Sequence, residues 1–325
     1  MQSVSELING FSRLKVLIIG DLMIDSYTWG RVSRISPEAP VPVVNVIRRE
    51  SRLGGAGNVV LNIASLGARA VICSVIGDDA PGRELQKIIL DFNLSTEGLI
   101  VEAGRMTTVK ERIIAGSQQV VRVDSETENT ISSSSQQALL AHIKRSLTDV
   151  DVIIFEDYDK GVLNDSLIQA VISMAKENNI PTVVDPKRKN FFSYQGATLF
   201  KPNLHELRDG LGLLSMDFDA EHLVDTVRKF KESQAFKGVF VTLSERGVYI
   251  DFENHQKLIP AHIRQISDVS GAGDTVISIA ACVLALGGSM EQIASLANLG
   301  GGLVCESLGV VPINVALLRK EADQL

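Results

Sequence analysis

The chain has 325 residues, of which 45% are hydrophobic and 22% are charged, values that are ordinary for a globular protein. Its 39 acidic residues outnumber its 32 basic residues and give a formal net charge of −7, which argues against the basic surface of a nucleic-acid-binding protein. No uncharged apolar run approaches the roughly 18 residues of a membrane-spanning helix. We therefore expect neither a nucleic acid nor a membrane as partner.

The cysteines Cys73, Cys282 and Cys305 are far apart in the chain and lie among apolar or small residues. An odd number of cysteines without metal-ligand spacing predicts buried, reduced thiols rather than a disulfide framework. No secretory signal pattern precedes Lys15. These features are typical of a cytoplasmic protein.

Short apolar runs, bounded by turn or polar residues, alternate along the chain with segments of helical periodicity. The predicted strands are Lys15–Ile19, Ala70–Ile76, Val152–Phe155, Thr182–Val184, Thr198–Phe200 and Val239–Leu243. The predicted helices are Gly57–Leu66, Pro81–Phe92, Gln136–Leu147, Asp165–Asn178, Leu204–Leu213, Ala220–Ser233, Asp274–Leu286 and Met290–Cys305. This order predicts an α/β fold with a mostly parallel sheet covered by helices on both faces. No linker interrupts it, so we expect residues 1–325 to form a single domain.

Two stretches, at about residues 27–51 and 105–124, show half-polar alternation without intervening helices. Alternating strands of this kind predict an antiparallel β flap that stands off the main sheet and covers a site. The alternative is a pair of ordinary surface hairpins.

Residues 268–275, Asp-Val-Ser-Gly-Ala-Gly-Asp-Thr, are the stretch around which the rest of the chain is organised. Gly271, Ala272 and Gly273 carry no bulky side chain, so a ligand can approach the backbone where helix-start amides form an anion site. An acid inside that site, Asp274, suits phosphoryl transfer, in which amides stabilise the phosphate and a carboxylate receives the acceptor's proton. The alternative is that Asp274 only caps the helix.

Glycines and an asparagine mark a second polar site, which we expect to bind a sugar. Gly54 and Gly55 are predicted to open a helix rather than to leave a strand, and Asn58 lies on the helix's inner face. Asparagine offers both a donor and an acceptor to a diol. Asp21 and Asp25 follow the first strand at its carboxyl end, where ligands bind in open α/β sheets. A turn or cap role is the alternative for each acid.

Two further stretches follow predicted strands and point to a nucleotide. Asn203 and Glu206 are three residues apart, a spacing that fits a helix cap and also a shell of Mg²⁺-bound water held by Glu206. Thr242, Ser244 and Gly247 lie in a tight turn that we expect to border a phosphate or a ribose, with a plain hairpin as the alternative.

Together, residues 54–58, 203–206 and 268–274 resemble the signatures of the ribokinase-like, pfkB-type carbohydrate kinase family. The resemblance implies a ribokinase-like fold, ATP and Mg²⁺, with a monovalent cation as a further candidate. It also implies that Asn298, in the second apolar helix, belongs to the ATP site. Ser244 departs from the pattern, because much of the family has glycine there.

Within the family, residues 33–44, Lys110, Arg112 and Gln118–Gln119 are similar to the kinase half of heptose kinase/adenylyltransferases. This likeness implies ATP-dependent phosphorylation of the anomeric hydroxyl of D-glycero-D-manno-heptose 7-phosphate, which supplies ADP-heptose and lipopolysaccharide core synthesis. Lys110 and Arg112 share one strand face and would bind the substrate's phosphate. The alternative is an exposed basic face paired with acids such as Asp124.

The family's common assembly implies a homodimer formed through the flap. The nucleotidyltransferase motif Gly-x-Phe-Asp-x-x-His-x-Gly-His is not found in the chain, so we expect the second activity of the fused enzymes to be absent. Two other functions stay open: a kinase for fructose phosphate or ribose, and a non-catalytic sensor of a sugar or nucleotide.

Overall fold

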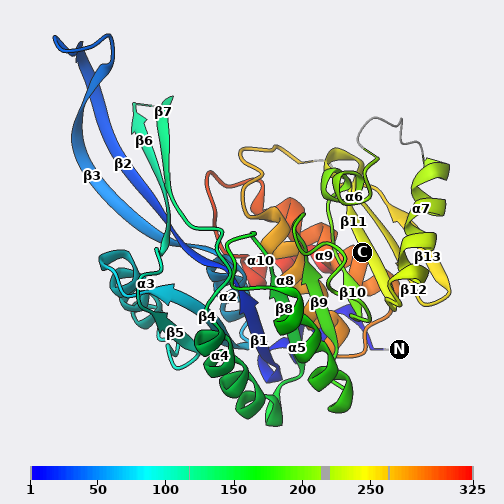
Figure 1. The fold of residues 1–325 in the computed structure, drawn as a ribbon. Coiled ribbons are helices and arrows are strands. Elements are labelled where there is room, and N and C mark those ends of the chain that lie inside the picture. Colours follow the sequence, from blue (N-terminus) through cyan, green and yellow to red (C-terminus); the bar gives the residue numbers. More distant parts are fainter. Residues whose placement is uncertain (1, 117, 214–219, 263, 324–325) are drawn as a thin grey trace.

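The main body is built on a nine-stranded sheet in the order β13-β12-β11-β10-β9-β8-β1-β4-β5, and a smaller sheet rises from one end of it (Figure 1). The computed structural model describes residues 2–116, 118–213, 220–262 and 264–323. The strands of the main sheet are β1 Lys15–Gly20, β4 Arg69–Gly77, β5 Leu99–Glu102, β8 Val152–Glu156, β9 Thr182–Asp185, β10 Leu199–Phe200, β11 Gly238–Thr242, β12 Val248–Phe252 and β13 His255–Ile259.

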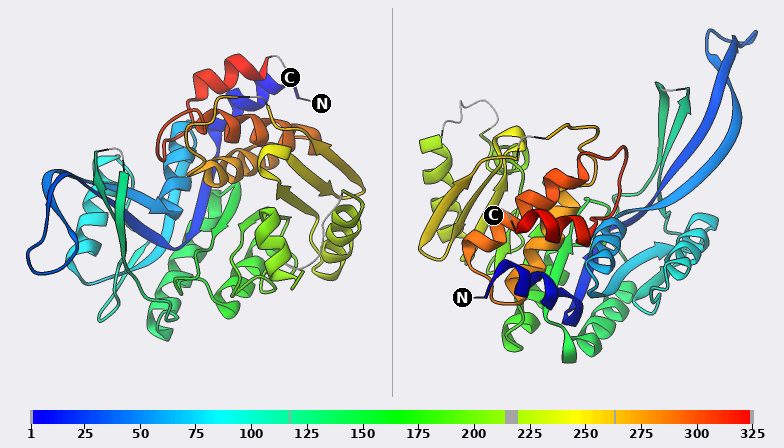
Figure 2. Two further views of the ribbon diagram at one scale, coloured as in Figure 1. Left: turned by 90° about the horizontal axis from the view of Figure 1, so that it is seen from above. Right: turned by 180° about the vertical axis from the view of Figure 1, so that it is seen from behind.

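Helices cover both faces of this sheet because its central strands are apolar on both sides. In β1, Val16 and Ile18 pack into one hydrophobic cluster and Leu17 and Ile19 into another. The first cluster receives α1 Val4–Gly10, α2 Ala56–Ser65, α3 Ala80–Asp91, α8 Ala272–Ala285, α9 Met290–Val304 and α10 Val315–Ala322. The second receives α4 Ser133–Ser146, α5 Asp165–Glu177, α6 Leu204–Gly210 and α7 Ala220–Ser233. The view from above in Figure 2 shows the two layers on either side of the sheet.

All strand pairs from β5 to β11 are parallel, and β12 and β13 at the far edge pair antiparallel. The prediction of a mostly parallel sheet is therefore confirmed. The sequence pattern did not indicate β5, β13 or α10. The residues of β13 are almost all exposed, and the eight residues of α10 bury only Leu318 and Ala322, so neither element carries a strong hydrophobic period.

The smaller sheet is the predicted flap, with strand order β3-β2-β6-β7. Its strands are β2 Leu22–Ile35, β3 Pro42–Gly55, β6 Thr108–Ala115 and β7 Gln118–Ser125. The prediction that it is antiparallel is wrong at its centre, because β2 pairs parallel with β6. The chain returns along β3 and then passes through α2, β4, α3 and β5 before β6 begins, so β6 leaves the main body in the same direction as β2 (Figure 1).

The first hairpin of the flap is longer than residues 27–51. Its strands pair from Leu22 opposite Gly55 to Ile35 opposite Pro42. Gly54 and Gly55 therefore end a strand, and α2 follows directly at Ala56, contrary to the prediction that these glycines open the helix.

The outer part of the flap exposes apolar side chains. Val32, Ile35, Val46 and Ile47 on the first hairpin and Val121 on the second are each more than 40% exposed. Figure 1 shows this part of the flap standing clear of the main body.

Candidate active site

Helix α8 begins at Ala272, two residues before the predicted start. Its N-cap, Gly271, has a left-handed backbone (φ 80°), and an added Cβ there would lie 2.8 Å from Val310 Cγ1. Glycine is therefore required for conformation and for space. The earlier start places Ala272, Gly273 and Asp274 in the first turn, where backbone amides have no acceptor inside the helix. The predicted anion site is thus geometrically available.

Asp274 is buried at this helix start, with 6% of its surface exposed. Burial, followed by the charge of Asp185, raises the pKa of Asp274 to about 6. A hydrogen bond from Asn58, the charge of Lys201 and a hydrogen bond from the Tyr158 hydroxyl act in the opposite direction and lower this pKa. The carboxylate can therefore accept a proton near neutral pH, as a general base must.

Glu156 joins Asp185 and Asp274 in a buried cluster whose carboxylate oxygens lie within 4.8 Å of one another. Lys201, itself buried, forms an ion pair of 2.8 Å with Asp185. Burial and the charges of both acids raise the pKa of Glu156 well above its usual range. Its Oε2 atom is buried without a hydrogen-bond partner in the described chain. An all-oxygen donor set with an unpartnered carboxylate oxygen fits Mg²⁺.

The predicted nucleotide residues lie at the ends of neighbouring strands. Asn203 and Glu206 form the predicted reciprocal cap of α6, with bonds of 2.8 Å in both directions. Asn203 also bridges to Thr242 at the end of β11, which brings the two nucleotide stretches together. Glu206 in addition bonds Lys187. Burial lowers the pKa of Lys187, but the charges of Asp185 and Glu206 outweigh it and raise that pKa overall.

The turn after β11 contains two residues in the left-handed backbone conformation that glycine adopts most readily. Ser244 has φ 56° and Gly247 has φ 91°, both in the left-handed region. Ser244 therefore adopts the conformation that favours the glycine expected from the family pattern. Asn298 in α9 donates to the Pro260 carbonyl at 2.9 Å, on the segment that follows β13. Thr242, Ser244, Gly247 and Asn298 thus lie at one edge of the sheet, on β11 to β13 and the helix that packs against them.

The predicted sugar residues lie where the flap joins the main body. An added Cβ at Gly54 would be 2.4 Å from Asp25 Oδ2, so only glycine admits this carboxylate. Gly55 has φ 58° and turns the chain into α2. Asn58, in the first turns of α2, is buried beside Asp274 and lowers the pKa of that carboxyl, while its own Oδ1 has no partner in the described chain. The structure therefore brings the sugar stretch and the phosphoryl-transfer stretch together.

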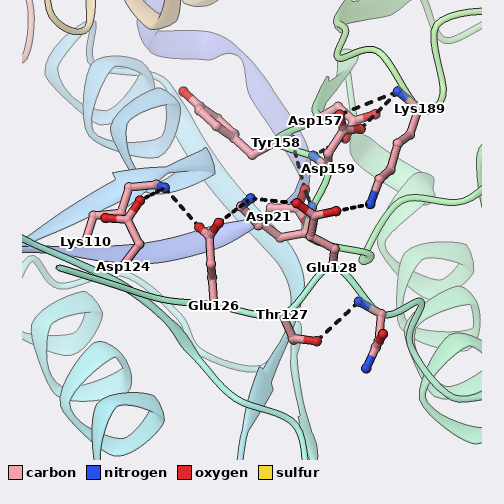
Figure 3. A network of polar contacts seen from close by, with 12 residues as sticks. Asp21, Lys110, Asp124, Glu126, Thr127, Glu128, Asp157, Tyr158, Asp159 and Lys189 are labelled. Atoms are coloured by element: carbon pink, nitrogen blue, oxygen red, sulfur yellow. Dashed lines mark hydrogen bonds and ion pairs between the residues drawn. The ribbon is translucent and has the colours of Figure 1, made fainter. Parts of the chain in front are cut away.

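Lys110 and Arg112 lie on β6 at the base of the flap. Arg112 forms an ion pair with Asp25. Lys110 contacts Asp124 at 3.3 Å and Glu126 at 3.0 Å, and Lys160 binds the other oxygen of Glu126 at 3.0 Å. Figure 3 shows Lys110 between the two acids, in a network that continues to Glu128 and Lys189. Lys110 is thus paired with Asp124, as the alternative interpretation expects. Arg112 instead pairs with Asp25, which is itself predicted to bind the sugar.

Asp21 does not face a ligand. Its carboxylate accepts hydrogen bonds from the backbone amides of Tyr158, Lys160 and Val162, and only 1% of it is exposed. Burial, followed by the charge of Asp157, raises its pKa to about 6. The expectation that Asp21 recognises a hydroxyl is therefore wrong. Its carboxylate oxygens instead hold the backbone of the loop after β8 in place.

Glu156, Tyr158 and Lys201 were missed as site residues. Glu156 and Tyr158 follow the predicted strand Val152–Phe155, and Lys201 follows Thr198–Phe200. The rule that drew attention to Asp21, polar residues at the carboxyl end of a parallel strand, applies equally to these residues.

Cys73, Cys282 and Cys305 are buried and unpaired, as predicted. Among the helices of the described residues, none is long and apolar enough to cross a membrane.

Residues 13–315 match the pfkB family carbohydrate kinases. The chain is 40% identical over 316 residues to the bifunctional protein HldE of Syntrophotalea carbinolica and 38% identical over 307 residues to that of Sulfurimonas denitrificans. These alignments cover 96% and 94% of this chain but 64% of each relative, so the chain spans about two thirds of the length of the relatives it matches.

Two solved structures share the fold. Escherichia coli phosphofructokinase-2, in a tetrameric inhibited form, superposes with a TM-score of 0.78 at 16% identity and covers 95% of this chain and 99% of its own. Arabidopsis thaliana ribokinase, complexed with ribose and ATP, gives a TM-score of 0.72 at 17% identity and covers 94% and 99%. Sequence and fold agree: the chain belongs to the pfkB family of carbohydrate kinases, phosphotransferases that act on alcohol groups.

Proposed function

We propose that this protein transfers the γ-phosphoryl group of ATP to the anomeric hydroxyl of D-glycero-D-manno-heptose 7-phosphate and so supplies lipopolysaccharide core synthesis with the 1,7-bisphosphate. The observation that carries the proposal is the position of Asp274, buried at the start of α8 beside Asn58 of the sugar stretch. The identity of about 40% with HldE proteins supports the choice of a heptose phosphate.

In the proposed reaction Asp274 accepts the proton of the attacking hydroxyl. The hydroxyl oxygen forms a bond to the γ-phosphorus as the bond to the oxygen of ADP breaks. The amides of Gly271, the N-cap, and of Gly273 in the first turn stabilise the charge on the transferred group. The Ala272 amide between them donates to the Val269 carbonyl at 3.3 Å in this structure. The Lys201 ammonium lies beside them, 3.8 Å from an added Cβ at Gly273. These groups are fixed by the protein before substrate arrives.

Bound Mg²⁺ would neutralise charge on the ATP phosphates. Glu206 would hold it through water, since both of its carboxylate oxygens already bond the protein, and the carboxylates of Glu156 and Asp185 offer further oxygen ligands. Asn203, Thr242, Ser244, Gly247 and Asn298 would bind the nucleotide along the edge from β10 to β13.

The apolar outer flap supports a homodimer. The exposed valines and isoleucines on both hairpins are apolar surface, whose burial is favourable. The flap of a second copy of the chain would bury it. Val46→Glu and Ile47→Glu together should convert the dimer to a monomer in analytical ultracentrifugation.

The deciding experiment is ADP release with a panel containing heptose 7-phosphate, fructose phosphates and ribose. Turnover that is highest on heptose 7-phosphate supports the proposal. Turnover only on another sugar would assign a different substrate, and binding of sugars without any ADP release would identify a sensor.

A further inference from the structure

A cavity of about 390 Å³ lies between the base of the flap and α2. Its lining includes Asp25, Tyr27 and Arg52 from the flap and Asn58 and Asn62 from α2. Two of these, Asp25 and Asn58, are predicted sugar ligands. The cavity therefore coincides with the sugar site but adds a cation, Arg52, to which the sequence motifs give no role.

One side of the cavity lies next to the start of α8, where Asp274 is located. Asn58 lies beside Asp274, and Asn62 Oδ1 accepts a hydrogen bond from Thr275 Oγ1 at 3.1 Å, so both asparagines lie against the start of α8. The buried Asn58 Oδ1 has no donor in the described chain. A buried acceptor without a partner is costly, and a ligand hydroxyl would supply the missing donor.

The flap side of the cavity is cationic. The guanidinium groups of Arg52 and Arg112 lie 5.1 Å and 5.3 Å from the centre of the Tyr27 ring. Arg52 donates from Nε to Glu50 at 2.6 Å, and within the described residues neither of its Nη atoms makes a hydrogen bond. Its side chain is 37% exposed. The ring contact fixes the guanidinium while its outer donors stay available.

We propose that Arg52 binds the substrate's own phosphate, on the flap side of the cavity. This inference rests on the proposed function and names the residue that selects a phosphosugar over the free sugar. A phosphate dianion matches the two Nη donors of a guanidinium geometrically and in charge. Arg112, which approaches the same ring and is paired with Asp25, would be a second donor to the same phosphate.

Arg48 provides a matched control. It lies on the same strand as Arg52, contacts the same acid, Glu50, at 3.6 Å, and stacks over an aromatic ring, Trp29, at 4.8 Å. It does not line the cavity. Arg48→Gln and Arg52→Gln therefore change the net charge of the flap equally but alter the cavity only in the second variant.

The test compares kcat/KM for a phosphosugar with kcat/KM for the corresponding free sugar in wild type and both variants. Arg52→Gln should raise KM for the phosphosugar by about 10–100-fold, the loss expected for charged hydrogen bonds. KM for ATP and for the free sugar should stay within about twofold, and Arg52→Lys should be intermediate. Arg48→Gln should match wild type.

Equal losses in the two glutamine variants, or an equal loss on phosphosugar and free sugar, would overturn the role of Arg52. If wild type acts on a phosphosugar but Arg52→Gln leaves the selectivity ratio unchanged, the inference fails and the kinase proposal stands. If wild type acts only on a phosphosugar other than heptose 7-phosphate, the proposed function fails, and the ratio measured on that substrate decides the inference. If wild type acts on no phosphosugar, both fail.

Discussion

The hydroxyl of Tyr158 lies 3.2 Å from Oδ1 of Asp274, so a residue of the loop after β8 donates a hydrogen bond to the proposed catalytic base. This bond favours the charged carboxylate and lowers its pKa. In Tyr158→Phe the pKa of Asp274 should rise, and the acid limb of the pH–rate profile should move to higher pH. If the variant is active and its acid limb lies at the same pH as in wild type, this bond does not control the pKa of Asp274.

Replacing Asp274 by Asn keeps the shape of the side chain and removes the base. We expect kcat to fall by about 10²–10⁴-fold, measured by ADP release at saturating substrate. Because burial raises the pKa of Asp274 to about 6, its charged form costs stability above that pH. The variant should therefore be at least as stable as wild type at pH 8, and a large loss of stability with the lost activity would point to a structural role.

The raised pKa of Asp274 predicts an acid limb in kcat/KM. A base must be unprotonated, so the rate should be constant above a pH of about 6 and fall about tenfold per pH unit below it. The charge of Asp185 contributes to this pKa. Asp185→Asn should thus shift the limb to lower pH, and a shift to higher pH would exclude this explanation.

Arg112→Ala should raise KM for the phosphosugar with little change in KM for ATP. The expected loss is about 1.5–3 kcal/mol, the range for a hydrogen bond to a charged group. The variant also leaves Asp25 without its ion-pair partner, so Arg112→Lys is the control that keeps the charge. A phosphosugar KM equal to that of wild type in Arg112→Ala would place the phosphate elsewhere.

Ser244→Gly should preserve or increase stability. The left-handed backbone of Ser244 costs a non-glycine residue about 1–2 kcal/mol, which the greater freedom of glycine in the unfolded chain offsets by about 0.4–1 kcal/mol. Glu245 is the neighbouring control, because it lies in the same turn without a positive φ. Glu245→Gly should destabilise by about 0.5–1 kcal/mol, and chemical denaturation that ranks the two variants in the opposite order would contradict the strain.

Much of the fold could be predicted because each central element carries its own pattern. The four apolar residues Val16–Ile19, bounded by Lys15 and Gly20, are typical of a strand buried on both faces, and the longer run of small apolar residues after Asp274 is typical of a buried helix. The flap's parallel centre could not be predicted, because 72 residues lie between the end of β2 at Ile35 and the start of β6 at Thr108, and no local signal shows which strands pair.

Some residues of the candidate site could be predicted from the sequence and others could not. Gly271 and Gly54 could be singled out, because a Cβ at either position would clash with its surroundings. The partners of a buried charge could not be predicted. Asp21 and Asp25 look alike in sequence, yet Asp21 bonds three backbone amides and Asp25 pairs with an arginine. Which contact each acid makes depends on the loop after β8 and on β6, elements far away in the chain.

The two long strands of the flap join the main body almost without a linker, since β2 begins at Leu22 after β1 ends at Gly20, and β3 runs straight into α2. Each has 14 residues, which makes the flap a lever about 45 Å long. A rotation of about 5° at its base would move the tip by about 4 Å but Asp25, near the base, by only about 1 Å. The outer flap can therefore adjust its position by ångströms while the predicted sugar ligands keep nearly fixed distances to Asp274.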